Sequence, residues 1–128
     1  MSELYREIII DHYKHPRNFG VIKNADLQGG EDNVVCGDRV ELFLKLDKQK
    51  KVKEVKWQGE GCALSQASAS LLSEMLLGKN LKELVKISNK DILKVVGENL
   101  NPSRQKCATL SFEALTKTLN SNNSLPKR

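Results

Sequence analysis

The sequence has few cysteines and no long apolar run. Its three cysteines in 128 residues are an odd number at wide spacing, which does not suit the disulfide framework of a secreted protein. We therefore expect reduced thiols and a cytoplasmic location. Within residues 1–20 the longest purely aliphatic run is residues 8–10, between charged side chains. We expect neither a signal peptide nor a membrane span.

Aromatic residues are scarce as well, at 5% of the chain. The net charge of +5 comes from lysines spread along the whole sequence rather than from one basic stripe. Without stacking aromatics or a basic stripe, we expect no nucleic-acid binding. The charge is that of a solvated surface, although a basic face can dock an acidic protein partner.

The length and the 39% hydrophobic content suit one domain with one core, which buries roughly two-thirds of the unfolded surface. We expect this single domain over residues 1–119. The remaining residues, 120–128, are polar and include Pro126, so we expect a disordered tail.

Alternating apolar residues predict an antiparallel hairpin over residues 40–58. Apolar side chains occupy even positions from Val40 to Leu46, and odd positions at Val55 and Trp57, which is the period of half-buried strands. A turn centred between residues 48 and 49 pairs Val40 with Trp57 and Leu42 with Val55. Before the hairpin, the glycine-interrupted residues 26–35 are expected to form an irregular edge strand.

This register also brings two of the cysteines together. Extended toward the open end of the hairpin, it places Cys36 opposite Gly61, beside Cys62, and Asp38 opposite Gly59. Cys36 and Asp38 are two residues apart and share one face of the strand. The hairpin therefore predicts three converging ligands, namely Cys36, Asp38 and Cys62.

Helices are expected both before and after the hairpin in the sequence. An N-terminal helix ends before Pro16, residues 63–77 form a helix closed by Gly78, and residues 81–87 and 91–97 form two short helices. After Asn101-Pro102, a final helix is expected over residues 103–119. Cys62 then stands at a helix N-terminus, where unpaired N–H groups and the helix dipole stabilise negative charge.

Cys107 lies on the apolar face of the final helix, where a lone cysteine is usually a small buried hydrophobe. Its neighbours Arg104 and Lys106 indicate another role, because cations are expected near a cluster of thiolates. His12 and His15 are three apart and could form half of a metal site, but each lies where a helix packs or ends. We interpret both histidines as structural.

The predicted ligand set is thus Cys36, Asp38, Cys62 and Cys107. Tetrahedral zinc accepts three sulfurs and one oxygen, although structural zinc sites more often have four thiolates. The carboxylate is the weakest-held of the four ligands for a soft metal, so the site is suited to exchange of ligands.

With these residues the sequence resembles the iron-sulfur cluster assembly scaffold family, which includes the scaffold IscU, the N-terminal domain of NifU and the zinc-dependent sulfurtransferase SufU. The matching stretches run from Leu4 to Leu119: Leu4-Tyr5; Asp11-His12-Tyr13 with Pro16, Asn18 and Gly20; Cys36-Gly37-Asp38; Gly59 to Ala63 with Ser65 and Ala67 to Ser70; and Lys106-Cys107. The resemblance implies an α+β fold, a three-stranded antiparallel sheet with helices packed on one face. It also implies a metal-ligand role for Cys36, Asp38, Cys62 and Cys107.

The sequence mixes the signatures of two branches of this family. In the scaffold branch a histidine directly precedes the last cysteine, within a Leu-Pro-Pro-Val-Lys region that a dedicated chaperone recognises. In this sequence Lys106 occupies the position of that histidine. Arg104, Lys106 and the run from Cys107 to Leu110 instead resemble the sulfurtransferase branch. That branch usually carries a helical insertion, for which the segment between Gly78 and Cys107 is too short.

The resemblance therefore implies a zinc-dependent sulfurtransferase that accepts persulfide sulfur from a cysteine desulfurase, with Cys36 as the attacking thiolate. Arg104 and Lys106 would hold the persulfide anion. The alternative is a scaffold that assembles a [2Fe-2S] cluster from iron and sulfur and transfers it to apo-proteins. A purely structural zinc module is a third possibility. Whether the chain is an enzyme stays open at this point.

Overall fold

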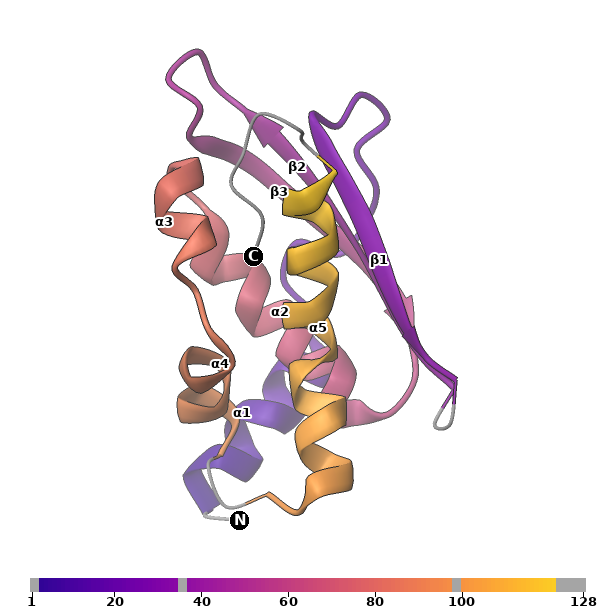
Figure 1. The fold of residues 1–128 in the computed structure, drawn as a ribbon. Coiled ribbons are helices and arrows are strands. Elements are labelled where there is room, and N and C mark those ends of the chain that lie inside the picture. Colours follow the sequence, from indigo (N-terminus) through magenta and orange to yellow (C-terminus); the bar gives the residue numbers. More distant parts are fainter. Residues whose placement is uncertain (1–2, 35–36, 98–99, 122–128) are drawn as a thin grey trace.

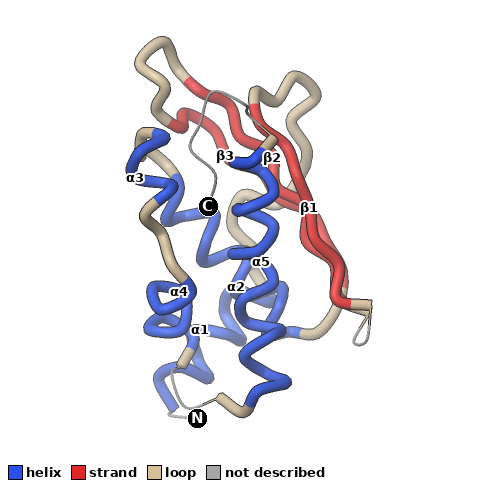
Figure 2. The backbone as a smooth tube through the Cα atoms, viewed as in Figure 1, coloured by secondary structure: helices blue, strands red, loops and turns tan. Residues whose placement is uncertain are grey.

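The computed structural model describes residues 3–34, 37–97 and 100–121. Within them, helices cover one face of a three-stranded antiparallel sheet of order β1-β2-β3 (Figures 1 and 2), which confirms the expected α+β fold. The strands are β1 (Leu27–Asn33), β2 (Asp38–Leu46) and β3 (Val52–Glu60). The helices are α1 (Glu3–Lys14), α2 (Ala63–Leu76), α3 (Leu81–Val85), α4 (Asn89–Val96) and α5 (Pro102–Asn120).

The predicted hairpin exists, but its predicted register is wrong by two residues. Val40 pairs with Gly59 rather than with Trp57, and Leu42 pairs with Trp57 rather than with Val55. The pairing also overturns the expected position of Asp38 opposite Gly59. Because the shift is an even number, each side chain keeps its predicted face of the sheet.

The turn explains the shift. Asp47 accepts backbone hydrogen bonds from residues 49 and 51 through its Oδ1 atom, and Lys50 adopts a positive φ of 64°. This closes a three-residue loop centred on Gln49, and an irregularity between Lys45 and Leu46 advances the pairing by one more residue. Alternation alone could not predict either feature, because both depend on turn geometry.

The core lies between the inner face of the sheet and the helices. Val40, Leu42 and Leu44 of β2 are fully buried, as are the small side chains that α2 presents. Alanines and serines such as Ala67 and Ser68 are fully buried and allow α2 to pack closely on its neighbours, at the density of a protein interior. The fold thereby fixes the N-terminal ends of α2 and α5 beside the start of β2.

Buried polar contacts attach α1 and the loop after it to α2 and β3. His12 Nδ1 lies 2.8 Å from Ser70 Oγ, and the same hydroxyl accepts the backbone N–H of Arg17 at 2.9 Å. The indole N–H of Trp57 donates to the backbone carbonyl of Arg17 at 2.8 Å. His12 therefore has the structural role expected for it, whereas His15 is exposed just beyond the helix.

The remaining elements follow the sequence-based expectations to within a few residues. The edge strand forms as β1, Gly78 adopts a positive φ of 81° after α2, and Asn101 caps α5. Residues 122–128 of the expected tail lie outside the described residues. No helix in the described part of the chain is both long and apolar enough to span a membrane.

Candidate metal centre

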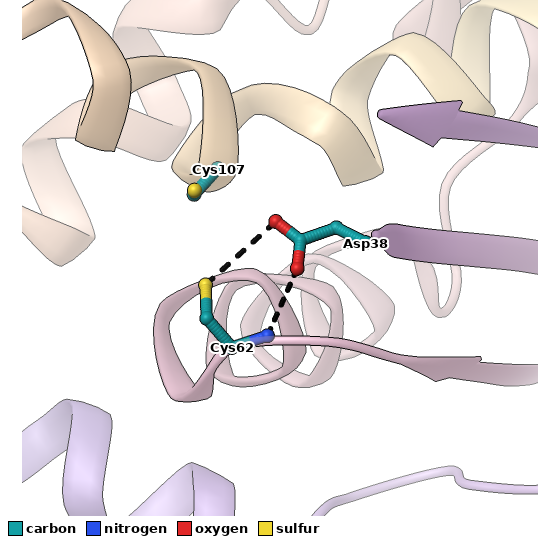
Figure 3. A group of neighbouring side chains, drawn as sticks. All are labelled: Asp38, Cys62 and Cys107. Atoms are coloured by element: carbon teal, nitrogen blue, oxygen red, sulfur yellow. Dashed lines mark hydrogen bonds between the residues drawn. The ribbon is translucent and has the colours of Figure 1, made fainter. Parts of the chain in front are cut away.

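Three of the four predicted ligands meet at one end of the sheet (Figure 3). One ligand atom from each of Asp38, Cys62 and Cys107 lies within 4.8 Å of the other two. Asp38 is the first residue of β2, Cys62 immediately precedes α2, and Cys107 stands near the start of α5. The fourth predicted ligand, Cys36, lies outside the described residues.

Asp38 is held by the backbone of Cys62. Its Oδ1 atom accepts the Cys62 backbone N–H at 2.9 Å, and its Oδ2 atom lies 3.8 Å from the Cys62 Sγ atom. The Asp38 side chain is 2% exposed. Gly61 makes this approach possible: its φ is +139°, and a Cβ atom there would clash with the Asp38 Oδ1 atom. The Cys62 backbone thus fixes the orientation of the Asp38 carboxylate.

Cys62 caps the N-terminus of α2, as the sequence predicted. Its Sγ atom accepts the backbone N–H of Ser65 at 3.4 Å, and its carbonyl accepts the Ser65 hydroxyl at 3.0 Å. Free N–H groups at a helix start favour a negatively charged ligand sulfur. Cys62 is exposed, so its sulfur is reachable from solvent.

Cys107 supplies the buried side of the centre and is 9% exposed. Burial, and to a lesser extent the neighbouring Cys62 and Asp38 groups, together raise the pKa of its thiol to about 12. The cause is that a thiolate at Cys107 would be poorly solvated and would face two other groups that become negative. A bound cation would remove this penalty, because it offsets the charge of all three groups.

The donor set fits a zinc ion. Zinc binds thiolate sulfur at about 2.3 Å and carboxylate oxygen at about 2.0–2.2 Å in tetrahedral sites, and the three ligand atoms already lie within 4.8 Å of one another. A buried carboxylate beside two thiols is a donor set whose charge a bound cation would balance once the thiols bind it as thiolates. Asp38, Cys62 and Cys107 therefore form a possible metal site.

A cleft of about 420 Å³ opens beside the two thiols. It is lined by Arg6, Ile9 and Ile10 of α1, by Cys62, Ala63 and Leu64 at the start of α2, and by Arg104 and Cys107 of α5. Arg104 therefore borders the same cleft as the two thiols. Lys106 is exposed and is not among the described residues that line the cleft.

The sequence pattern did not predict that α1 takes part in this cleft. Arg6, Ile10 and Tyr13 recur at intervals of four and three, so they lie along one side of the helix. The side chains of Ile10 and Tyr13 are 43% and 50% exposed. In the sequence, Ile10 and Tyr13 indicate an exposed apolar side of this helix. Only the folded structure shows that this side adjoins the cleft.

Comparisons with known proteins identify the family of this chain. Residues 4–127 match the family described as NifU-like N terminal domain. The chain belongs to this family. Among curated members, it is 38% identical to the zinc-dependent sulfurtransferase SufU of Bacillus subtilis, over 91% of this chain and 90% of that protein. It is 33% identical to the iron-sulfur cluster assembly scaffold protein IscU 1 of Archaeoglobus fulgidus, over 91% and 74% of the two chains.

Solved structures of the NifU-like family share the fold. A crystal structure from Fervidobacterium islandicum AW-1, described as a candidate iron-sulfur cluster assembly scaffold protein for the SUF system, superposes with a TM-score of 0.72. Its sequence is 31% identical, over 93% of this chain and 96% of that one. The NifU-like N-terminal domain from Brucella abortus gives a TM-score of 0.75 at 19% identity, over 96% of each chain, which speaks to the fold alone.

The lengths of the two alignments differ in an informative way. The alignment with the B. subtilis protein runs over 134 positions, although 91% of this 128-residue chain is only about 116 residues. About 18 positions of that relative therefore face gaps in this chain. The alignment with the A. fulgidus protein runs over 116 positions at the same 91% coverage of this chain, which leaves essentially no gaps in this chain. Within the aligned region, this NifU-like chain is more identical to the B. subtilis protein but lacks about 18 positions that this relative has, and it shows no such gap against the A. fulgidus protein.

Proposed function

We propose that this NifU-like protein is a zinc-dependent sulfur acceptor in iron-sulfur cluster biogenesis, which takes persulfide sulfur from a cysteine desulfurase in the cytoplasm. The observation that carries the proposal is the convergence of Asp38, Cys62 and Cys107 at one end of the sheet. The 38% identity to a zinc-dependent sulfurtransferase supports the same function. The thiols require a reducing compartment, hence the cytoplasm.

Asp38, Cys62 and Cys107 would hold the zinc ion, with Cys36 as the fourth ligand. When bound, zinc supplies a charge that keeps these thiols deprotonated at neutral pH. Asp38 is the oxygen donor among sulfur donors and so the ligand most easily released. Its hydrogen bond to the Cys62 backbone keeps the carboxylate in place whether or not it touches the ion.

The sulfur-transfer step would use Cys36 as the nucleophile. Its thiolate attacks the terminal sulfur of the persulfide on the desulfurase, a new S–S bond forms, and the S–S bond within the desulfurase persulfide breaks. The desulfurase cysteine leaves as a thiolate, so the step needs no external oxidant or reductant. Arg104 and Lys106 would stabilise the persulfide anion on this chain, and the position of Arg104 beside the two thiols supports its part in that role.

Turnover of the cysteine desulfurase from the same organism tests this proposal. We expect a large acceleration when the zinc-loaded protein is added, and no acceleration with the Cys36→Ser variant. The variant must retain the circular dichroism spectrum and melting curve of the wild type, so that lost activity does not reflect lost folding. Full acceleration by the folded Cys36→Ser variant would remove Cys36 from the nucleophile role.

One observation favours a second function, that of a scaffold for a [2Fe-2S] cluster. The alignment with an IscU scaffold protein needs essentially no gaps in this chain, whereas the alignment with the sulfurtransferase leaves about 18 of its positions unmatched here. Here the cluster is cargo, assembled on Cys36, Cys62 and Cys107 and handed to apo-proteins. Anaerobic reconstitution with iron and sulfide, followed by transfer to an apo-ferredoxin, would support the scaffold. Desulfurase acceleration without a transferable cluster would support the sulfur acceptor.

A further inference from the structure

The cleft beside the two thiols combines apolar walls with unpaired positive charge. Ile9, Ile10 and Leu64 contribute its apolar wall, and the guanidinium-bearing residues Arg6 and Arg104 stand on two different helices that border it. Neither arginine forms an ion pair within residues 3–34, 37–97 and 100–121. No acidic side chain is among the described residues that line the cleft.

The helix dipoles increase this positive potential. The N-terminal ends of α2 and α5 both border the cleft, through Cys62 and Ala63 on one side and Arg104 on the other. Helix N-termini carry partial positive charge, so two helices and two arginines act in the same direction. An anionic group near Arg6 and Arg104 would meet both arginines and both helix N-termini. The one carboxylate described at the thiols is the buried Asp38, 3.8 Å from the Cys62 sulfur, and a bound cation would offset its charge.

The exposed surface of α1 extends the cleft outward. Ile10 is 43% exposed and Tyr13, one turn further along the same side, is 50% exposed. Exposed apolar side chains that continue an apolar cleft indicate contact with another macromolecule, because a small anion would need only the arginines. Aromatic and arginine side chains are also the types enriched at protein interfaces.

We propose that this cleft receives a segment of the cysteine desulfurase that presents a large apolar side chain next to acidic residues. The apolar side chain packs between Ile10 and Leu64, and its acidic neighbours pair with Arg6 and Arg104. The segment would close the solvent-exposed side of Cys62 during sulfur transfer. This inference rests on the proposed function, because it takes the desulfurase as the partner, and it adds the surface that recognises it.

The test is the affinity of the zinc-loaded protein for the desulfurase from the same organism. Arg6→Glu should weaken binding by about tenfold or more, since it replaces an attraction by a repulsion, and should flatten the dependence of affinity on ionic strength. Ile10→Ala should weaken binding severalfold at all salt concentrations. Both side chains lie on the surface of α1, so zinc content and melting temperature should stay at wild-type values.

Two matched variants control for nonspecific effects. Lys53→Glu makes the same change of charge at the opposite end of β3 from the site. Leu77→Ala removes an apolar side chain that is 44% exposed, nearly the same as Ile10, at the far end of α2. Neither should change the affinity.

The outcomes separate this inference from the proposed function. Unchanged affinity of Arg6→Glu and Ile10→Ala, with normal desulfurase acceleration, would overturn the docking surface and leave the function standing. Weakened binding of these two variants, with no acceleration of the desulfurase by the wild type, would support the surface and overturn the sulfur-acceptor function. Absence of any binding by the wild-type protein would overturn both.

Discussion

The carboxylate of Asp38 is oriented by a backbone group of Cys62, 24 residues later in the chain, through a hydrogen bond of 2.9 Å to the Cys62 N–H. One candidate ligand thus positions another through the protein backbone. The two oxygens of Asp38 have different tasks, since Oδ1 accepts the N–H while Oδ2 faces the Cys62 sulfur. This division of tasks can be tested by substitution.

Asp38→Asn should separate the two tasks. The amide oxygen can still accept the Cys62 N–H, so we expect the free energy of unfolding of the metal-free protein to change by less than about 1 kcal/mol. The negative charge is lost, so zinc affinity should fall by about tenfold or more. Competition with a chromophoric chelator measures the affinity, and urea unfolding measures the stability. Equal zinc affinity in both proteins would show that Asp38 is not a ligand.

Gly61→Ala should disturb the site without removing any candidate ligand. A Cβ atom at this position would overlap the Asp38 Oδ1 atom, and the φ of +139° is unfavourable for any side chain. We expect a loss of about 1–3 kcal/mol in the free energy of unfolding, together with reduced zinc affinity. Gly78→Ala is the control, because its φ is also positive, at +81°, but no atom lies within 4 Å of the added methyl group. The control should lose stability and keep its zinc affinity; parallel losses of affinity would contradict the steric explanation.

His12 should make stability depend on pH. Burial lowers the pKa of His12 below its ordinary value and the Arg17 charge lowers it further, against weaker opposing effects of Glu74 and Asp11. The unfolded state therefore binds a proton more readily than the folded state. The contribution of neutral His12 to the free energy of unfolding is fully present above the ordinary histidine pKa and is lost as the pH falls below it.

The His12→Gln variant isolates this contribution, because the same carboxylates titrate in both proteins. We expect the unfolding free energy of the wild type to fall more steeply than that of the variant between pH 7.5 and 5.5, by at most about 1.4 kcal/mol per pH unit for one linked proton. Urea unfolding at several pH values measures both slopes. Identical slopes would show that His12 titrates alike in the folded and unfolded states.

The two described cysteines should react with alkylating agents at very different rates. Cys62 is exposed and Cys107 is buried. We expect iodoacetamide to modify Cys62 first and Cys107 only when the fold opens, as followed by peptide mass spectrometry. Added zinc should protect Cys62. Rapid modification of Cys107 in the folded protein would contradict its buried position.

Alternation in the sequence was sufficient to predict which side chains face the core, but not which residues pair. Val40 and Leu42 are buried as expected, yet their partners differ by two positions because the Asp47 loop and a bulge set the register. The convergence of Asp38 with Cys62 survived this error, since a shift of two preserves the strand face. The contribution of Arg6 could not be predicted, because it depends on how α1 packs against α2.

The three candidate ligands also stand on elements that meet only in the finished fold. Asp38 opens β2, Cys62 precedes α2 and Cys107 belongs to α5, and no two of them are near neighbours in the sequence. An ion held by all three would be bound weakly by the unfolded chain, so its binding free energy adds to the stability of the native state. Conversely, a substitution in the core that loosens α5 from the sheet should release the ion. The zinc content of a purified variant would then serve as an assay of tertiary structure as well as of the site.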